Sequence, residues 1–216
     1  MYAKGMTVRD IQDHLMNLYR IDVSPTMISN ITDKIIPIIN EWQRRPLDPI
    51  YIHVVMDAIH YKVRQDGKVI NKAVYIVIGV DLDGFKEILG MWVGENETSK
   101  FWLKVLSDLK NRGVKDILIA SIDGLPGFKD AIVVTFPKIE VQRCIVHVIR
   151  NFTKYLSYKD RKAFISDLKT VYTAIDETEA LDALAAIESK WSEKYYIAIK
   201  PWKDHWDEIS TMFKYP

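Results

Sequence analysis

The sequence has a single cysteine, Cys144, among its 216 residues. It therefore cannot form an internal disulfide, and this cysteine usage fits a reducing compartment. It has no apolar run of the ~18 residues that a membrane-spanning helix requires, and its first residues do not resemble a signal peptide. From these absences we expect a cytoplasmic protein without a membrane partner.

The sequence also lacks a marked excess of either charge. It has 30 Lys and Arg residues against 29 Asp and Glu residues, for a net charge of +1. This balance neither requires nor excludes a nucleic-acid partner, because acids can cluster at a metal site while bases cluster on a binding face.

Two apolar stretches each lead into a single aspartate. Residues 52–59 and 117–124 are rich in strand-forming residues, which is typical of strands that are buried on both faces of a sheet. Burying an ionised carboxylate is costly unless a second charge compensates it. Asp57 and Asp123 therefore indicate two carboxylates that together bind a divalent cation. The alternative is that each aspartate caps the turn after its strand.

The elements expected between residues 50 and 156 follow one another in an informative order. Residues 50–93 predict a three-stranded antiparallel meander, with Asp-Gly turns at residues 66–67 and 83–84. A helix over 98–112, a strand over 117–123, a short helix over 126–135, a strand over 139–144 and a helix over 145–156 then follow. This is the order of a ribonuclease-H-like α/β fold, with a mixed five-stranded sheet. In that fold the first strand is central and the fourth lies parallel beside it, so Asp57 and Asp123 would meet at one end.

The N-terminal segment, residues 7–35, predicts two helices around a tight turn. Thr7 with Asp10 is a capping pair, and Ser24 before Pro25 is a second helix start. Each helix is expected to bury an apolar stripe; the two stripes are Val8, Ile11, Leu15 and Leu18, and Ile28, Ile31 and Ile35. This plan is typical of a helix-turn-helix that reads DNA, although an ordinary helical hairpin has the same pattern. A linker is expected to begin near Arg44.

The outer face of the second predicted helix is small and polar. The candidate DNA-contacting residues there are Thr26, Ser29, Asn30 and Lys34.

Residues 157–216 predict an all-helical subdomain. Ser157 with Asp160 and Asp176 with Glu179 mark two helix starts, and Pro201 marks a third. The first helix is expected to bury Phe164, Leu168 and Val171; apolar and aromatic residues recur at helical spacing in the other two, namely Leu184, Ile187, Trp191, Trp202, Trp206, Ile209 and Phe213. We expect these tryptophans to form a core, and the alternative is that they stack on unpaired bases.

Several blocks of residues carry a family resemblance. They are residues 56–60, 72–75, 101–103, 123–128 and, most specifically, the Gln-Arg-Cys-x-x-His-x-x-Arg-Asn block at 142–151. Together they resemble the mutator-type transposases of bacterial insertion sequences, over nearly the whole chain.

The resemblance implies a DDE transposase with a ribonuclease-H-like core. Such an enzyme cuts DNA and joins strands with two divalent metal ions, normally Mg²⁺ with Mn²⁺ as a substitute. Asp57 and Asp123 would be its first two acids, and residues 157–216 its helical insertion. The implied partners are the ends of the element, target DNA and further copies of the chain, in the nucleoid of a bacterial cell.

One departure from the family pattern bears on activity. The family's third acid is a glutamate after the helical insertion, and this chain has no acid between Val141 and Lys159. We therefore expect a truncated gene product or a fragment, inactive by itself and prone to aggregate or oligomerise. The acids that could substitute are Glu140, Asp207 and Glu208. The alternative functions are a non-catalytic protein that binds element ends and inhibits intact copies, and a structure-selective nuclease.

Four polar residues of the specific block lie near the expected acids. His147, Arg150 and Asn151 are candidates for contacts with DNA phosphate or with the catalytic site, the alternative being an ordinary capped helix. Arg143 belongs with Arg150 to a basic cluster that is a candidate phosphate-contacting face, the alternative being a solvated helix surface. Cys144 and His147 do not predict a zinc site, because neither a second cysteine nor a close histidine pair is available. The predicted parts are a helical DNA-binding segment (1–43), a catalytic core (44–156) and the helical subdomain (157–216).

Overall fold

The computed structural model describes residues 1, 6–65, 67–94 and 98–215. The chain divides into two compact units, Met1–Pro46 and Leu47–Pro216, and each is described by itself. The predicted turn at residues 66–67 falls partly on Asp66, which lies outside the described residues.

The N-terminal unit contains three helices, α1 (Val8–Tyr19), α2 (Pro25–Asp33) and α3 (Ile36–Arg44). The predicted capping pair is confirmed, since the Thr7 amide donates to the Asp10 carboxylate at 2.8 Å and the Asp10 amide donates to the Thr7 hydroxyl at 3.2 Å. The Ser24 hydroxyl likewise accepts from the Met27 amide at 3.1 Å, with Pro25 in the first turn. Local capping signals therefore placed the starts of α1 and α2 correctly.

The apolar stripes of this unit are buried less than predicted. Its buried cluster consists of Ile11, Val23 and Ile28. Leu18, Ile31 and Ile35 were expected to be buried, but their side chains are 62%, 50% and 46% exposed. The prediction was wrong because two short helices meet around one small cluster. Val8 and Leu15 pack against this cluster, but the three exposed side chains lie outside it.

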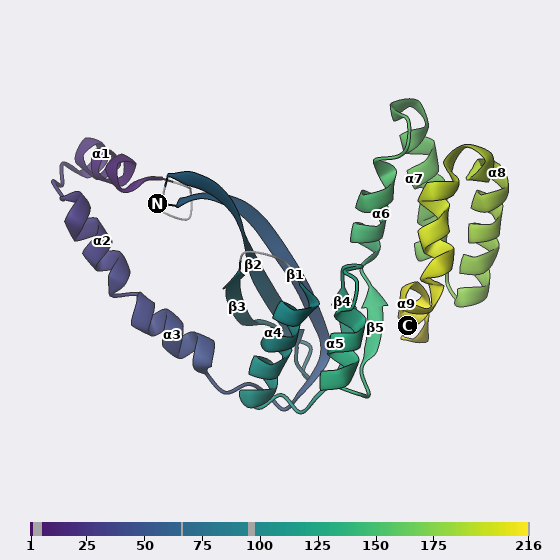
Figure 1. Ribbon diagram of the computed structural model, residues 1–216, viewed down its shortest axis with the longest axis horizontal. Helices are drawn as coiled ribbons and strands as arrows, with labels where there is room; N and C mark the ends of the chain where they lie inside the picture. Colours follow the sequence, from purple (N-terminus) through teal and green to yellow (C-terminus); the bar gives the residue numbers. More distant parts are fainter. Residues whose placement is uncertain (2–5, 66, 95–97, 216) are drawn as a thin grey trace. The chain divides into compact units, whose positions relative to one another are not determined.

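The second unit is built on a five-stranded mixed sheet. Its strands are β1 (Ile50–Gln65), β2 (Lys68–Val80), β3 (Lys86–Gly94), β4 (Asp116–Ile122) and β5 (Glu140–Arg143), in the order β3-β2-β1-β4-β5. β1 pairs antiparallel with β2, and β2 with β3, whereas β4 is parallel to both β1 and β5 (Figure 1). The prediction of a central first strand with the fourth parallel beside it is confirmed.

β1 differs from the prediction near Asp57. The strand does not end there but continues to Gln65, because β2 pairs with it antiparallel from His53 to Gln65. The parallel pairing with β4, in contrast, is recorded only as far as Val55. Nor is β1 buried on both faces at this point, since Val54 and Met56 are buried while Asp57 is exposed. Asp57 thus lies in the part of β1 that pairs with β2 beyond the recorded pairing with β4.

Two helices, α4 (Ser99–Asn111) and α5 (Phe128–Thr135), pack on the sheet and complete its core. Trp102 is fully buried and stacks on Phe128, with 4.5 Å between the ring centroids. The predicted buried face of α4 is confirmed; it consists of Trp102, Val105, Leu106 and Leu109.

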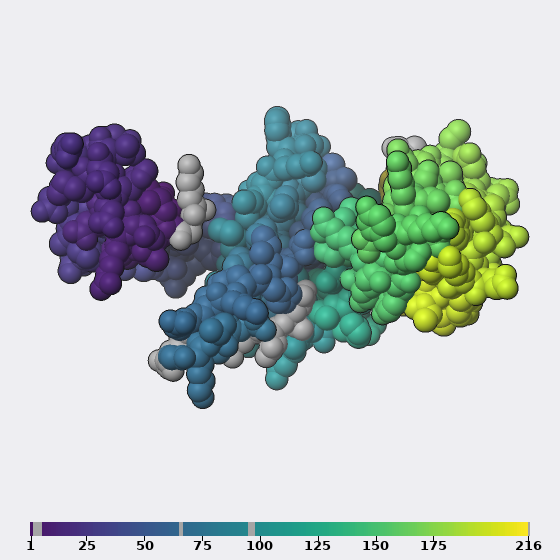
Figure 2. Space-filling model, turned by 90° about the horizontal axis from the view of Figure 1, so that it is seen from above, coloured from purple at the N-terminus to yellow at the C-terminus, as the bar shows by residue number. Residues whose placement is uncertain are grey.

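The remaining helices have a hydrophobic cluster of their own. They are α6 (Ile145–Thr153), α7 (Tyr158–Tyr172), α8 (Glu177–Asp204), α9 (Trp206–Ile209) and the 3₁₀ helix η2 (Ser210–Lys214). Coloured green to yellow, they form one closely packed region in the space-filling view (Figure 2). Trp202 is fully buried in this cluster, as the core interpretation predicted.

The predicted helix start at Pro201 is wrong. α8 runs through Pro201 to Asp204 and is interrupted instead at Tyr195, whose φ of −135° and ψ of 37° leave the helical region. A proline inside a helix removes one backbone hydrogen bond and kinks the helix, but flanking turns can still continue it.

Candidate catalytic site

The strand register brings Asp57 and Asp123 to one edge of the sheet. In the parallel pair, Val55 of β1 lies opposite Ser121 of β4. Asp57 lies two residues after Val55, and Asp123 lies two residues after Ser121. Neighbouring strands lie about 4.8 Å apart. Side chains two residues apart share a face of a strand, and His53 Nε2 and Ser121 Oγ on this face are 2.7 Å apart. The two acids therefore lie near the end of the parallel pair.

Neither carboxylate is fully buried, contrary to the expectation for these two strands. The Asp57 side chain is 51% exposed, and its Oδ1 accepts from the Ala58 amide at 2.8 Å. Asp123 is half-buried, and its Oδ1 accepts from the Leu125 amide at 3.3 Å. The expected burial of Asp57 was wrong because β4 ends beside it and leaves its face open to solvent. Asp123 makes the local backbone contact that the turn-capping interpretation predicted, whereas Asp57 lies inside β1 and caps no turn.

α6 directs a histidine toward Asp57. The helix starts directly after β5, where the Cys144 amide donates to the Ile122 carbonyl at 2.7 Å. One turn later, His147 Nε2 lies 3.9 Å from Asp57 Oδ1. The other ring nitrogen, Nδ1, is buried and has no hydrogen-bond partner among the residues that the structure describes. Of the predicted helix residues, His147 is thus beside the acids, whereas Arg150 and Asn151 are exposed on α6.

Within the described ranges, no group of three or more His, Cys, Asp or Glu side chains is arranged to hold a metal ion. Cys144 and His147 belong to no such group in this part of the chain.

A cavity of about 340 Å³ opens beside Asp123. Lys129 of α5, Arg143 of β5 and Glu208 of α9 line it together with Asp123 and the glycine that follows. Arg143 Nε and Nη2 each lie 2.8 Å from Glu208 Oε2, and Lys129 Nζ lies 3.2 Å from Glu208 Oε1. Sequence reasoning missed Lys129, because no local pattern distinguishes it from other surface lysines.

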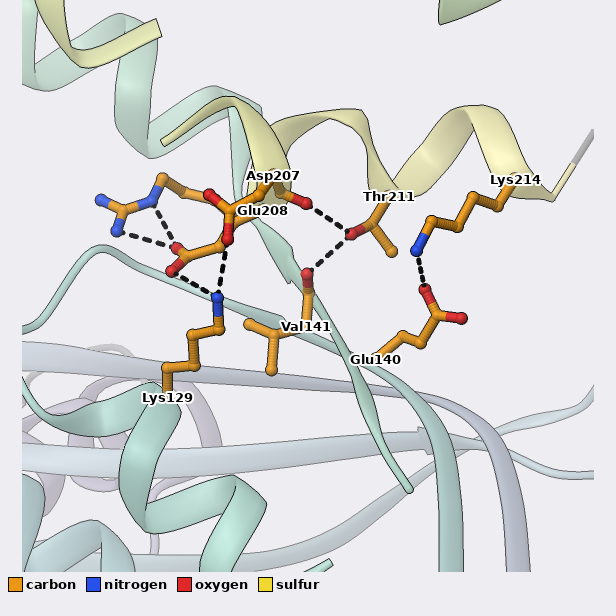
Figure 3. Close-up of polar contacts among 8 residues, drawn as sticks. Lys129, Glu140, Val141, Asp207, Glu208, Thr211 and Lys214 are labelled. Atoms are coloured by element: carbon orange, nitrogen blue, oxygen red, sulfur yellow. Dashed lines mark hydrogen bonds and ion pairs between the residues drawn. The ribbon is translucent and has the colours of Figure 1, made fainter. Parts of the chain in front are cut away.

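The three acids considered as substitutes for a third ligand all have cationic partners (Figure 3). Glu208 pairs with Arg143 and Lys129, and Lys129 also lies 2.9 Å from Asp207. Lys214 Nζ is 2.6 Å from Glu140. Hydrogen bonds from these lysines lower the pKa of Asp207 and of Glu140 below their ordinary values.

The polar residues expected on the second helix are exposed. Thr26, Ser29, Asn30 and Lys34 lie on or directly after α2, and their side chains are open to solvent in the N-terminal unit. They form a polar surface without any packing role there.

Comparison with known proteins identifies the family. The model of the family described as "Transposase, Mutator family" matches residues 1–216. The chain belongs to this family. It is 49% identical over 217 residues to the transposase for insertion sequence element ISRM3 of Rhizobium meliloti. It is 45% identical over 217 residues to a probable insertion-sequence transposase of Corynebacterium diphtheriae. In both comparisons the whole of this chain is covered.

This Mutator-family chain covers only part of each relative, 54% of the first and 63% of the second. Among solved structures, a simian T-cell lymphotropic virus intasome in complex with the PP2A regulatory subunit B56 gamma is 13% identical. The match covers 74% of this chain and 49% of the other, with a TM-score of 0.32. No helix in the described ranges is long and apolar enough to cross a membrane.

Proposed function

We propose that this chain carries two of the three acidic ligands of a DDE transposase, on a ribonuclease-H-like core. The observation that carries the proposal is the register of β1 and β4, which brings Asp57 and Asp123 of a Mutator-family chain to one edge of a mixed sheet. The order β3-β2-β1-β4-β5 is consistent with the proposed fold. The reaction is the cutting and joining of DNA at the ends of an insertion sequence.

The two carboxylates fit a divalent cation such as Mg²⁺. Mg²⁺ is commonly bound by one or two carboxylates and retains several water molecules. Within the described part of the chain, neither aspartate forms an ion pair with a lysine or an arginine, and Asp57 is open to solvent. When bound, such ions activate a water or 3′-hydroxyl and stabilise the leaving oxygen.

The other residues would position DNA around the acids. His147 would orient the Asp57 carboxylate or contact the adjacent phosphate, since its Nε2 is 3.9 Å away. Arg150 and Asn151 of α6 would contact phosphates on the exposed side of the same helix. The polar face of α2, from Thr26 to Lys34, would contribute further contacts to DNA in the manner of a helix-turn-helix.

A second function, binding without catalysis, is favoured by one observation. Glu140, Asp207 and Glu208 are each engaged by a lysine, an arginine or both. If these three acids stay paired, none of them supplies the third metal ligand. The chain would then bind DNA and a metal ion but would not cleave DNA.

Metal binding tests the proposal directly. Calorimetric titration with Mn²⁺ or Mg²⁺ is expected to show binding by the parent chain and its loss in both Asp57→Asn and Asp123→Asn. Asp116→Asn is the matched control, because Asp116 lies at the opposite end of β4 and is also half-buried. Binding that survives in Asp57→Asn and Asp123→Asn would contradict the two-aspartate site.

A further inference from the structure

Arg143 and Lys129 converge on one carboxylate from two different elements. Arg143 comes from β5, and it contacts Glu208, which lies 65 residues after it. Lys129 comes from α5 and contacts the same carboxylate (Figure 3). The side chains of Arg143 and Glu208 are 15% and 10% exposed. This arrangement is more enclosed than an ordinary surface ion pair.

The same two cations have the chemistry of a phosphate-binding site. A guanidinium with an ammonium beside it recognises the oxygens of a carboxylate or of a phosphate in the same way. The Arg143 guanidinium crosses the backbone of Gly124, where an added Cβ would collide with it. Gly124 directly follows Asp123, so the cations and the candidate metal ligand line one cavity.

The ion pair is not the main attachment of the C-terminal segment to β5. Ile209 is fully buried, and its carbonyl accepts from the Gln142 side chain at 3.1 Å. The Thr211 hydroxyl donates to the Val141 carbonyl at 2.9 Å, and Lys214 pairs with Glu140 (Figure 3). Enclosed ion pairs often contribute little net stability, because desolvation offsets their attraction. Glu208 is thus not required to hold the segment in place.

We propose that Arg143 and Lys129 form a binding site for a phosphodiester group of DNA, which Glu208 fills in the free chain. The inference rests on the proposed function, because DNA is the ligand that brings a phosphate to Asp123. Glu208 competes with the phosphate for the two cations, and Asp207 does so more weakly through Lys129. Neutralising Glu208 therefore frees Arg143 for DNA and leaves Lys129 with Asp207 as its only competing carboxylate among the described residues.

Binding of DNA by charge-matched variants tests this site. The probe is a fluorescein-labelled 20-base-pair duplex of mixed sequence, in EDTA, with anisotropy measured from 50 to 200 mM salt. Glu208→Gln is expected to bind about threefold tighter or more at 50 mM salt, and to steepen the dependence of log K on log salt by about one, as one added phosphate contact does. Gln keeps a hydrogen-bond acceptor for Arg143.

Glu188→Gln is the matched control. It removes the same charge and frees a lysine, since Glu188 pairs with Lys203 at 2.6 Å. Asp207→Asn is the second variant, because Asp207 is 68% exposed and its loss should not impair folding. It is expected to give a smaller gain than Glu208→Gln, and the double variant Glu208→Gln/Arg143→Gln is expected to lose the gain.

The outcomes separate this inference from the proposed function. Equal effects of Glu208→Gln and Glu188→Gln, or unchanged binding in both Glu208→Gln and Asp207→Asn, would overturn the phosphate site while leaving the transposase proposal intact. If no variant and no parent chain bound DNA, both proposals would be overturned.

Discussion

The N-terminal unit and the sheet of this chain show two different relations between sequence and burial. The unit Met1–Pro46 has well-formed helix caps, yet its buried cluster is limited to Ile11, Val23 and Ile28. The sheet has a continuous core in which Trp102, Tyr75 and Phe128 are completely buried. Caps define where a helix begins, but burial against a second layer determines whether it adds to stability.

The difference also bears on function. The sheet and its helices can hold Asp57 and Asp123 in place because their positions depend on strand pairing. The N-terminal unit instead leaves large apolar side chains exposed. A partner that covered them would be stabilised by the hydrophobic burial that the unit does not achieve by itself.

The largest expected effect comes from breaking the sheet core. Trp102→Ala should lower the free energy of unfolding by about 3–5 kcal/mol, since it removes a fully buried ring stacked on Phe128. Tyr19→Ala, in the N-terminal unit, is the contrasting variant because Tyr19 is 62% exposed, and it should change that free energy by less than about 0.5 kcal/mol. Urea unfolding followed by circular dichroism measures both free energies of unfolding. Equal losses of stability in the two variants would contradict the difference in burial between the two units.

A smaller effect is expected within the helical cluster, and it should depend on pH. The Asp160 carboxylate is bonded to Lys194, Tyr195 and Ser157, and the hydrogen bond from Lys194 is the main reason that its pKa falls from 3.8 to about 2. Because the folded pKa is depressed, the stabilisation is complete above the ordinary pKa and is lost as the pH falls from about 4 through 2.

Asp160→Asn should therefore lower Tm at pH 7, and the difference from the parent should shrink as the pH falls toward 3. Asp182→Asn, an exposed change on α8, should follow the parent throughout. Thermal melts at a series of pH values provide the measurement. A difference that stays constant with pH would show that the Asp160 contacts do not depend on its charge.

A still smaller and more local effect is expected at the start of α1. Thr7→Ala removes both hydrogen bonds of the Thr7 hydroxyl with Asp10 and should destabilise α1 by about 1 kcal/mol. The global unfolding midpoint should hardly move, because this helix contributes little to the main core. Faster amide exchange confined to α1 would show that the N-terminal unit contributes little to global stability. A large fall in Tm would contradict this.

The sequence predicted the parts of this structure that follow from local signals. The buried face of α4, the capping pair at Thr7 and the antiparallel meander of β1, β2 and β3 follow from periodicity and from turn residues. The hydrophobic pattern also identified Phe164, Leu168 and Val171 as the buried residues of α7. Each of these predictions required only residues within one element and its immediate neighbours.

What the sequence did not predict depends on contacts between distant residues. β1 continues past Asp57 because β2 pairs with it, and the exposure of Asp57 follows from where β4 ends. The pairing of Glu208 with Arg143 and Lys129 joins three separate elements. Each feature is set by packing between elements, which no local pattern records.

The smallest expected change in stability lies on the exposed stripe of the N-terminal unit, where the effect should appear as self-association instead. We expect the double variant Ile31→Lys/Ile35→Lys to leave Tm unchanged, because both side chains are already about half exposed. The sedimenting mass of the parent should rise with concentration. This rise should be smaller for the double variant, because any contact between these stripes would bury two charges. Val134→Lys, at a residue that is 75% exposed on α5, is the control and should sediment like the parent. If Val134→Lys reduced self-association and the double variant did not, the apolar surface that self-associates would belong to the sheet unit. The sheet unit, and not the N-terminal unit, would then be the one that needs a partner to complete its burial.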